Sequence, residues 1–359
     1  MQQHRTQRLA LLGAFAALAT AGMLASTSPM AQDSIDLEGK NVAFVLWGFD
    51  GYQQGQGNWF QKIAEEAGAA NVTLIDGKVD PSVQLRALDD LIAGGIDGIA
   101  YQPVEPAAAV PSILAAQAAG IPLVVIGARP DPASAVAPAA LFNDYETTFR
   151  AGEHAAMWLK ASKPGEKAKL VIFDVMTLGY CKDGRMQGFI DGVSAAMGAD
   201  NVEIKFRDTV EHKREVSLAK MEDQLQRDPD FNIFTACGAD GVLGGIVALQ
   251  AAGRATAVDK VPQTEYIFTI DGTPSELELL FAKESSVMET MTLTPKENGA
   301  AAAALLSQVI AGSVSPNQDL VINLPGVLLP ANCEQSAAIF ADQYGLNADF
   351  TPLDCSKYN

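Results

Sequence analysis

The chain has 359 residues, of which 43 are acidic and 25 are basic, so its formal net charge at neutral pH is −18. An acidic balance of this size disfavours binding to nucleic acids and to anionic membrane surfaces, because basic patches supply most of the binding energy there. With this length and 48% hydrophobic residues, the chain is expected to form two domains, each with a buried core.

The first 31 residues have the layout of a secretory signal peptide. MQQHRTQR carries arginines and no acid, LALLGAFAALATAGMLA is apolar, and STSPMAQDS is polar. We expect cleavage after Ala31, with Ala25 as a competing position. A retained membrane anchor is disfavoured, because the apolar run is barely long enough to span a bilayer and no basic cluster follows it. The mature protein is therefore expected to be exported and soluble.

Sequence patterns typical of strands and of helices alternate along the first half of the mature chain. Continuous apolar runs of strand length occur at residues 41–46, 71–76, 95–103 and 120–127. Between them, apolar residues with helical spacing occur at 57–68, 83–94 and 107–120. Strands that lack an apolar and polar alternation, each followed by a helix, predict a parallel sheet that is covered on both faces.

The same alternation begins again after ALFNDYETT (residues 140–148). Strands are predicted at 169–175, 202–210, 231–240 and 265–271, and helices at 185–198, 216–228 and 242–253. The chain therefore reads as two doubly wound α/β units of similar size. No low-complexity linker separates them, so we expect the hinge to consist of short crossings.

The four cysteines of the mature chain are expected to form disulfides in an exported protein, and four cysteines allow three pairings. Cys333 and Cys355 lie close in sequence, so we pair them as a staple for the C-terminal tail, which leaves Cys181 with Cys237. A zinc site is not expected, because the chain has no C-x-x-C pair and its mature histidines lie far apart in sequence. We predict no cofactor.

Polar or aromatic side chains stand where nearly every predicted strand ends. In sheets of this kind, ligands bind beyond the carboxyl ends of the strands. Any one such residue usually serves as a cap or a turn, and Asp271 before Gly272 is a common turn former. The recurrence favours a binding site. The candidates are Trp47, Asp50, Tyr52, Gln53, Gln102, Arg129, Asn143, Asp144, Arg185, His212, Asp240 and Asp271.

The order of several segments resembles the ribose-type (type I) periplasmic sugar-binding proteins of ABC transporters. These segments are IDGIAYQPVEP, AAQAAGIPLVVIG, FNDYETTFRAGEHAA, RMQGF, ALQAAG and TIDGTP. The resemblance spans roughly residues 41–322. It implies an N-terminal lobe of residues 38–143 plus 294–322 and a C-terminal lobe of residues 144–293. Residues 323–359 lie beyond the resemblance, which assigns them no role, and we expect them to form a C-terminal extension that is stapled by one disulfide and packed on the lobes.

The resemblance also assigns roles to single residues. The polar and aromatic residues of the family's first loop fall on Asp50, Tyr52 and Trp47, and the family's Asn or Gln before Pro falls on Gln102. The domain crossing falls at Asn143 and Asp144. The arginine that holds sugar hydroxyls falls on Arg185, and the aspartate of the F-D-G-T motif falls on Asp271, which is then expected to accept hydrogen bonds from ligand hydroxyls.

Two departures from the family pattern bear on the ligand. Many pentose and hexose binders carry Asp-Arg after the fourth strand, whereas this chain has Ala128-Arg129, so Arg129 replaces the usual arginine only if the loop shifts. After the predicted strand FNIFTA, many members of the family carry an Asn-Asp pair, whereas this chain has Gly238 and Ala239 before Asp240. We therefore expect a neutral sugar or polyol other than plain ribose, held by charged groups and covered by aromatic rings.

Several other functions fit the sequence less well. The chain lacks the G-x-S-x-G, P-loop and H-E-x-x-H motifs, and it lacks the third glycine of a dinucleotide fingerprint. Asp50 and Asp271 could serve as the acid and base of a glycosidase, although both also suit plain binding. The effector domain of a lactose-repressor-like regulator is disfavoured by the export signal. A receptor for a sensor kinase or chemoreceptor stays open.

The sequence thus predicts a monomeric periplasmic solute-binding protein, without enzymatic activity, that delivers a carbohydrate or polyol to an ABC permease in the inner membrane. Ligand binding is expected to favour the closed arrangement of the two lobes.

Overall fold

The computed structural model describes residues 35–49, 51–210, 212–329, 332–347 and 351–358. The predicted signal peptide and the candidate ligand residue Asp50 lie outside these residues. Asp36–Asn359 forms one compact unit by its internal contacts. Within the described ranges, no helix combines the length and the apolar character needed to cross a membrane.

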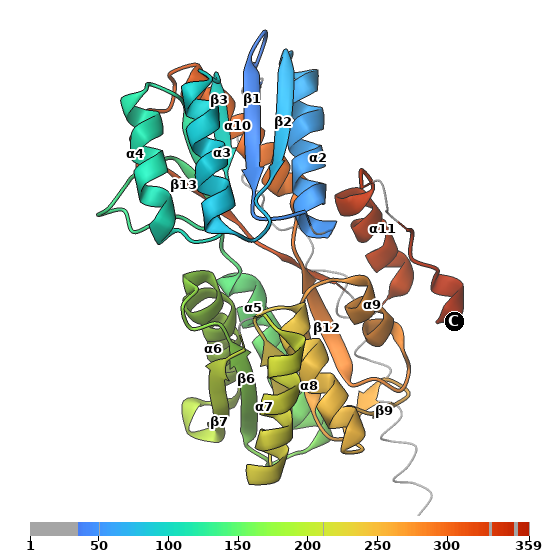
Figure 1. Ribbon diagram of the computed structural model, residues 1–359. Helices are drawn as coiled ribbons and strands as arrows, with labels where there is room; N and C mark the ends of the chain where they lie inside the picture. The colour runs from blue at the N-terminus through green and yellow to red at the C-terminus, as the bar shows by residue number, and fades with distance from the viewer. Residues whose placement is uncertain (1–34, 50, 211, 330–331, 348–350, 359) are drawn as a thin grey trace, which may run out of the picture. The chain divides into compact units, whose positions relative to one another are not determined.

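The first sheet consists of six parallel strands in the order β13-β5-β4-β3-β1-β2 (Figure 1). Its strands are β1 (Asn41–Leu46), β2 (Asn71–Asp76), β3 (Gly98–Tyr101), β4 (Leu123–Gly127), β5 (Ala139–Phe142) and β13 (Val321–Leu324). The central strands β3 and β4 are buried along their whole length, which explains their continuous apolar sequences.

Helices cover both faces of this sheet, and we call the sheet with these helices the first lobe. They are α2 (Gly51–Glu66), α3 (Pro81–Ala93), α4 (Val110–Ala118) and α10 (Pro295–Ile310). Neighbouring residues of β1 point to opposite faces: Phe44 meets Phe60 of α2 at 5.2 Å between ring centres, whereas Val45 packs with Leu88 of α3 and Ile113 of α4. α2 begins at Gly51, six residues before the predicted start, and it thereby carries several cleft residues.

The second sheet also has six strands, in the order β14-β12-β11-β8-β6-β7. They are β6 (Ala168–Asp174), β7 (Val202–Thr209), β8 (Ile233–Ala236), β11 (Tyr266–Asp271), β12 (Val287–Thr292) and β14 (Val327–Leu329). All neighbours are parallel except β14, which runs antiparallel to β12. A short antiparallel pair, β9 (Ala257–Val258) and β10 (Val261–Pro262), lies outside this sheet.

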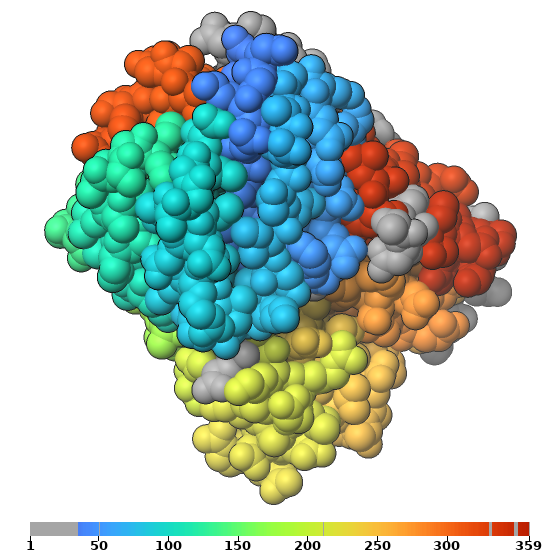
Figure 2. All heavy atoms as spheres, turned by 45° about the horizontal axis from the view of Figure 1, so that its top comes forward, coloured from blue at the N-terminus to red at the C-terminus, as the bar shows by residue number. Residues whose placement is uncertain are grey.

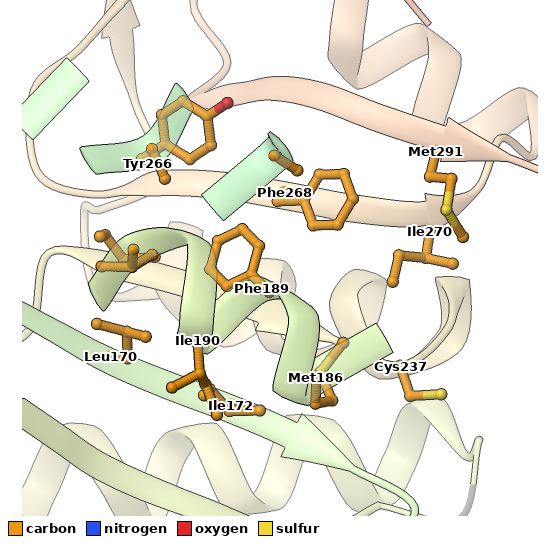
Figure 3. Close-up of a cluster of buried hydrophobic side chains, with 14 of the residues drawn as sticks. Leu170, Ile172, Met186, Phe189, Ile190, Cys237, Tyr266, Phe268, Ile270 and Met291 are labelled. Atoms are coloured by element: carbon orange, nitrogen blue, oxygen red, sulfur yellow. The ribbon is translucent and has the colours of Figure 1, made fainter. Parts of the chain in front are cut away.

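The helices of the second lobe also cover both faces of their sheet. They are α5 (Tyr145–Ser162), α6 (Gln187–Met197), α7 (Arg214–Arg227), α8 (Ala239–Ala251) and α9 (Pro274–Phe281). On one face, Phe189 of α6 stacks on Phe268 of β11 at 5.4 Å between ring centres (Figure 3). α5 and α6 approach so closely that a Cβ on Gly192 would lie 1.9 Å from the carbonyl oxygen of Phe149. The prediction of two doubly wound parallel α/β units is confirmed.

Three chain segments run between the sheets, from β5 to α5, from β12 to α10 and from β13 to β14. They are hydrogen-bonded to one another. Asp144 Oδ1 accepts from the backbone N–H of Gly326 at 2.9 Å, and Thr294 Oγ1 donates to the carbonyl of Pro325 at 3.3 Å. Short, cross-linked crossings of this kind fit the predicted hinge.

The chain ends in a segment that contains α11 (Cys333–Tyr344) and a 3₁₀ turn (Cys355–Lys357), and we call its described residues, 332–347 and 351–358, the C-terminal segment. The disulfide between Cys333 and Cys355 closes it, and a second disulfide joins Cys181 and Cys237, so both predicted pairs are confirmed. In Figure 2, this segment (red) lies against α2 (blue) and α9 (orange).

Different forces hold the C-terminal segment on its two sides. On the first lobe, Trp59 Nε1 donates to the carbonyl of Gln343 at 2.8 Å, and Asn347 Nδ2 donates to the carbonyl of Gly51 at 2.7 Å. On the second lobe, the ring of Tyr358 lies 5.4 Å from that of Phe281, and α11 enters the apolar cluster that includes α9.

Candidate functional site

A cleft of about 920 Å³ lies beyond the carboxyl ends of strands from both sheets. Residues of three parts of the chain line it. From the first lobe these include Trp47, Tyr52, Gln53, Gln102 and Phe142; from the second lobe Tyr180, Arg185, His212, Asp240 and Asp271; and from the C-terminal segment and its flanks Phe340, Tyr344, Asn347 and Tyr358.

Arg185 is a buried cation at the cleft wall. It lies in a π-helical turn, Tyr180–Met186, that joins β6 to α6, and only 4% of its side chain is exposed. Its Nε donates to Asp144 Oδ2 at 2.7 Å, and its Nη1 donates to the carbonyl of Cys237 at 2.9 Å. Burial alone would lower the pKa of Arg185, but the carboxylates of Asp144 and Asp271 outweigh it and raise this pKa. The guanidinium therefore stays charged.

Asp271 places a carboxylate beside this cation. It is the last residue of β11, and its Oδ2 accepts from the backbone N–H of Ala239 at 2.9 Å while its Oδ1 lies 3.7 Å from Arg185 Nη1. The side chain is 30% exposed, so it is held in place and still faces the cleft. Its φ of 116° is strained for a residue other than glycine, and such strain concentrates at functional sites.

The first lobe contributes side-chain amides. Gln102 follows β3 and Gln53 lies in the first turn of α2, and both are nearly buried at the cleft wall. Gln56, one turn further along α2, donates from Nε2 to the Oε1 atoms of both glutamines, at 2.6 Å for Gln53. The backbone of Gln102 is fixed in turn by Gln84, whose Nε2 donates to its carbonyl at 2.8 Å.

Three neighbouring aromatic rings of the cleft connect the first lobe to the second lobe. The ring of Phe142 at the end of β5 lies 6.1 Å from that of Tyr52 and 6.0 Å from that of Tyr180. The Tyr180 ring also lies 5.1 Å from the guanidinium carbon of Arg185. Such rings can cover the apolar C–H face of a sugar ring while the charged groups hold its hydroxyls.

His212 stands at the same end of the second sheet, near the disulfide. Burial, and secondarily the charge of Arg185, lowers the pKa of His212 to about 4, so the imidazole is neutral at pH 7. Its ring nitrogen and the sulfur atoms of Cys181 and Cys237 lie within 4.8 Å of one another. Because the two sulfur atoms are bonded to each other, this cluster offers no thiolate to a metal ion.

Comparison with known proteins decides the family. Residues 42–313 match the periplasmic binding protein domain. The chain belongs to this family of periplasmic binding proteins. The recognition of the family from its sequence segments is thereby confirmed, and so is the expected type I periplasmic binding protein fold.

Two curated proteins are similar in sequence to part of this chain. The chain is 25% identical over 194 residues to the ribose import binding protein of Bacillus subtilis, covering 54% of this chain and 60% of that protein. It is 30% identical over 194 residues to a xylitol-binding protein of Mycolicibacterium smegmatis, covering 52% of each chain. The aligned part thus spans about half to three-fifths of these relatives.

A solved solute-binding protein of Bacillus halodurans with bound myo-inositol matches the fold with a TM-score of 0.67 and 19% identity. The match covers 83% of this chain and 96% of that one. At this identity the likeness concerns the fold.

Not all of the predicted site residues face the cleft of this periplasmic binding protein. Arg129 and Asn143 do not occur among its described lining residues: Arg129 pairs with Asp319, and the backbone N–H of Asn143 donates to the carbonyl of Leu324. Asp144 is buried and acts on the cleft through Arg185. Asp240 lines the cleft but forms an exposed ion pair with Arg214 at 2.9 Å.

Sequence reasoning missed several features of the site. Phe142 was not among the predicted site residues, although it directly precedes the predicted candidate Asn143. Gln56 and Gln84 carry no motif, and their roles follow only from tertiary contacts. The C-terminal segment was expected as an extension of unknown role, whereas it contributes Phe340, Tyr344 and other residues to the cleft wall. Four aromatic residues in a short tail of the sequence, at positions 340, 344, 350 and 358, were the available signal.

Proposed function

We propose that this protein captures a small neutral sugar or polyol in the cleft between its lobes and hands it, without chemical change, to an ABC permease of the inner membrane. The observation that carries the proposal is the grouping of Arg185, Asp271, Gln102 and aromatic rings at strand ends in one cleft. Relatives named for binding ribose and xylitol support the ligand class.

The chemistry of the cleft favours a ligand with many hydroxyl groups and no charge. Arg185 is already balanced by Asp144 and Asp271, so an anionic ligand would add unbalanced negative charge and a cationic one would compete with the arginine. Hydroxyl groups can both donate to the Asp271 carboxylate and accept from amide hydrogens. A sugar or polyol can therefore bind both to the acceptor Asp271 and to the amide donors of the cleft.

The proposed mechanism is closure of two lobes around the ligand. We propose residues 38–143 with 294–322 as one lobe and 144–293 as the other, in keeping with the sheets to which most of these residues belong. Because each lobe supplies part of the polar set, a bound ligand is fully satisfied only when the lobes are closed, and binding shifts the population accordingly. The closed form is then the one that the permease recognises in the periplasm.

A thermal-shift screen tests the proposal, with D-ribose, D-allose, D-arabinose, xylitol and myo-inositol as the panel and calorimetric titration of each hit. A ligand at a hundred times its Kd adds about 2.7 kcal/mol to the free energy of unfolding, which raises the melting temperature measurably. The binder should be recovered unchanged after incubation with the protein. Stabilisation by charged solutes alone, or conversion of the bound sugar, would contradict the proposal.

A further inference from the structure

A directed chain of side-chain hydrogen bonds runs through the first lobe to the cleft. Asn298 Nδ2 of α10 donates to the Tyr52 hydroxyl at 2.7 Å, and this hydroxyl donates to Gln56 Oε1 at 3.3 Å. Gln56 Nε2 then donates to the Oε1 atoms of Gln53 and Gln102. Gln56 itself is fully buried, so its amide is fixed by these partners and not by water.

The direction of this chain decides which end of the Gln102 amide is turned toward Gln56. A hydroxyl has one hydrogen, and Tyr52 receives a hydrogen bond from Asn298, so its own hydrogen is directed to Gln56. The oxygen of Gln56 is thereby engaged, and both hydrogens of its amide nitrogen go to the two neighbouring glutamines. The oxygen of Gln102 is turned toward Gln56, which leaves its amide nitrogen on the opposite side.

The surroundings of Gln102 fit this orientation. A Cβ on Gly127 would lie 3.2 Å from Gln102 Nε2 and 2.9 Å from the ring of Phe142, so the missing side chain leaves room for the amide nitrogen beside the cleft. Gln84 holds the backbone at both ends of this turn, since its Nε2 donates to the Gln102 carbonyl and its Oε1 accepts from the Val104 N–H, each at 2.8 Å. The amide therefore has a fixed place as well as a fixed direction.

We propose that Gln56 is a positioning residue that makes the Gln102 side of the cleft a hydrogen-bond donor. The bound sugar or polyol must then present an oxygen that accepts on this side and a hydroxyl that donates to Asp271 on the other. This inference rests on the proposed function and makes it more specific, because Gln102 then donates to a ligand oxygen whereas Asp271 accepts from a ligand hydroxyl.

The test replaces Gln56 by Glu, which keeps the shape of the side chain and removes both donated hydrogens. In this variant, Gln102 turns its nitrogen toward the new carboxylate and its oxygen toward the ligand. The affinity for the tightest binder of the panel above should fall about tenfold or more by calorimetry. Gln61→Glu, the same substitution elsewhere on α2 outside the described cleft lining, is the matched control and should keep wild-type affinity.

Ligand analogues separate positioning from a general structural effect. For each hydroxyl of that binder, the deoxy and deoxyfluoro analogues are titrated, because fluorine can accept weakly and cannot donate. For at least one hydroxyl position of the ligand, the wild-type protein should bind the fluoro analogue more tightly than the deoxy analogue. Gln56→Glu should abolish this preference. Wild-type affinity in a folded Gln56→Glu variant, or an unchanged preference, would overturn the inference.

If Gln56→Glu does not fold, Gln56→Met removes the same hydrogens without adding a charge. It should likewise abolish the preference for the fluoro analogue, and an unchanged preference in that variant would refute the role of Gln56. Failure of wild-type protein to bind any sugar or polyol of the panel would instead defeat the proposed function, and the inference with it.

Discussion

Replacing Asp271 by Asn tests the central carboxylate of the cleft. Asp271 Oδ2 accepts from the Ala239 N–H at 2.9 Å, so Asn must keep its oxygen there to satisfy that donor. The amide nitrogen then occupies the place of Oδ1, 3.7 Å from Arg185 Nη1. A ligand hydroxyl that donates to Oδ1 loses its acceptor and meets a donor instead.

The size of the effect follows from these contacts. A hydrogen bond to a charged group contributes about 1.5–3 kcal/mol, so the affinity for the cognate sugar or polyol should fall about 10- to 150-fold. The hydrogen bond from Ala239 is retained, and Arg185 keeps its shorter ion pair with Asp144. The melting temperature of the free protein should therefore change little.

Calorimetric titration and thermal unfolding check the two parts of this prediction together. Asp183→Asn is the control, because Asp183 lies in the same π-helical turn as Arg185 and its side chain is 71% exposed. Asp271→Ala should lose both affinity and stability, since it also leaves the Ala239 N–H without its acceptor. Wild-type affinity in Asp271→Asn would refute the reasoning and return Asp271 to the role of a turn former.

Three further predictions concern other parts of the site. The pKa of His212 is lowered to about 4, against an ordinary value of about 6.5, so the folded state disfavours the charged imidazole. The free energy of unfolding should therefore decrease as the pH falls from about 6.5 toward 4, and His212→Gln should flatten this loss in thermal unfolding curves. Arg129→Ala should leave ligand affinity within about twofold of the wild type, because Arg129 pairs with Asp319 outside the cleft; a larger loss would restore it to the site. Serine at both Cys333 and Cys355, 22 residues apart, should lower the free energy of unfolding by about 3 kcal/mol in denaturant titrations, and an unchanged value would show that the disulfide does not constrain the unfolded chain.

The fold could be predicted because parallel sheets leave a clear local signal. Strands such as β3 are buried along their whole length and read as unbroken apolar runs, and β3 is followed by the helix α4. Arg185 and Asp271 could be assigned because they stand beside strand ends in segments that resemble the family. Both lie in the cleft, and their roles in ligand binding stay predictions.

The rest depended on contacts between distant parts of the chain. Arg129 looked like a cleft residue by its place after β4, but it pairs with Asp319, 190 residues away, and does not occur among the described lining residues of the cleft. Gln56 lies one residue before the predicted start of the first helix and carries no motif, and its burial and its contacts with Tyr52 and Gln102 became visible only in the folded chain. β14 consists of three residues, too few for a periodic pattern to show.

The attachment of the C-terminal segment has a consequence for movement between the lobes. Its bonds to α2 are directional and would break if the segment shifted by an ångström or two, whereas its contacts with α9 are apolar and can be exchanged for similar ones. When the lobes change their spacing, the segment should therefore move together with the first lobe and slide over Phe281. The aromatic wall that it adds to the cleft is then carried by the lobe that also bears Gln102.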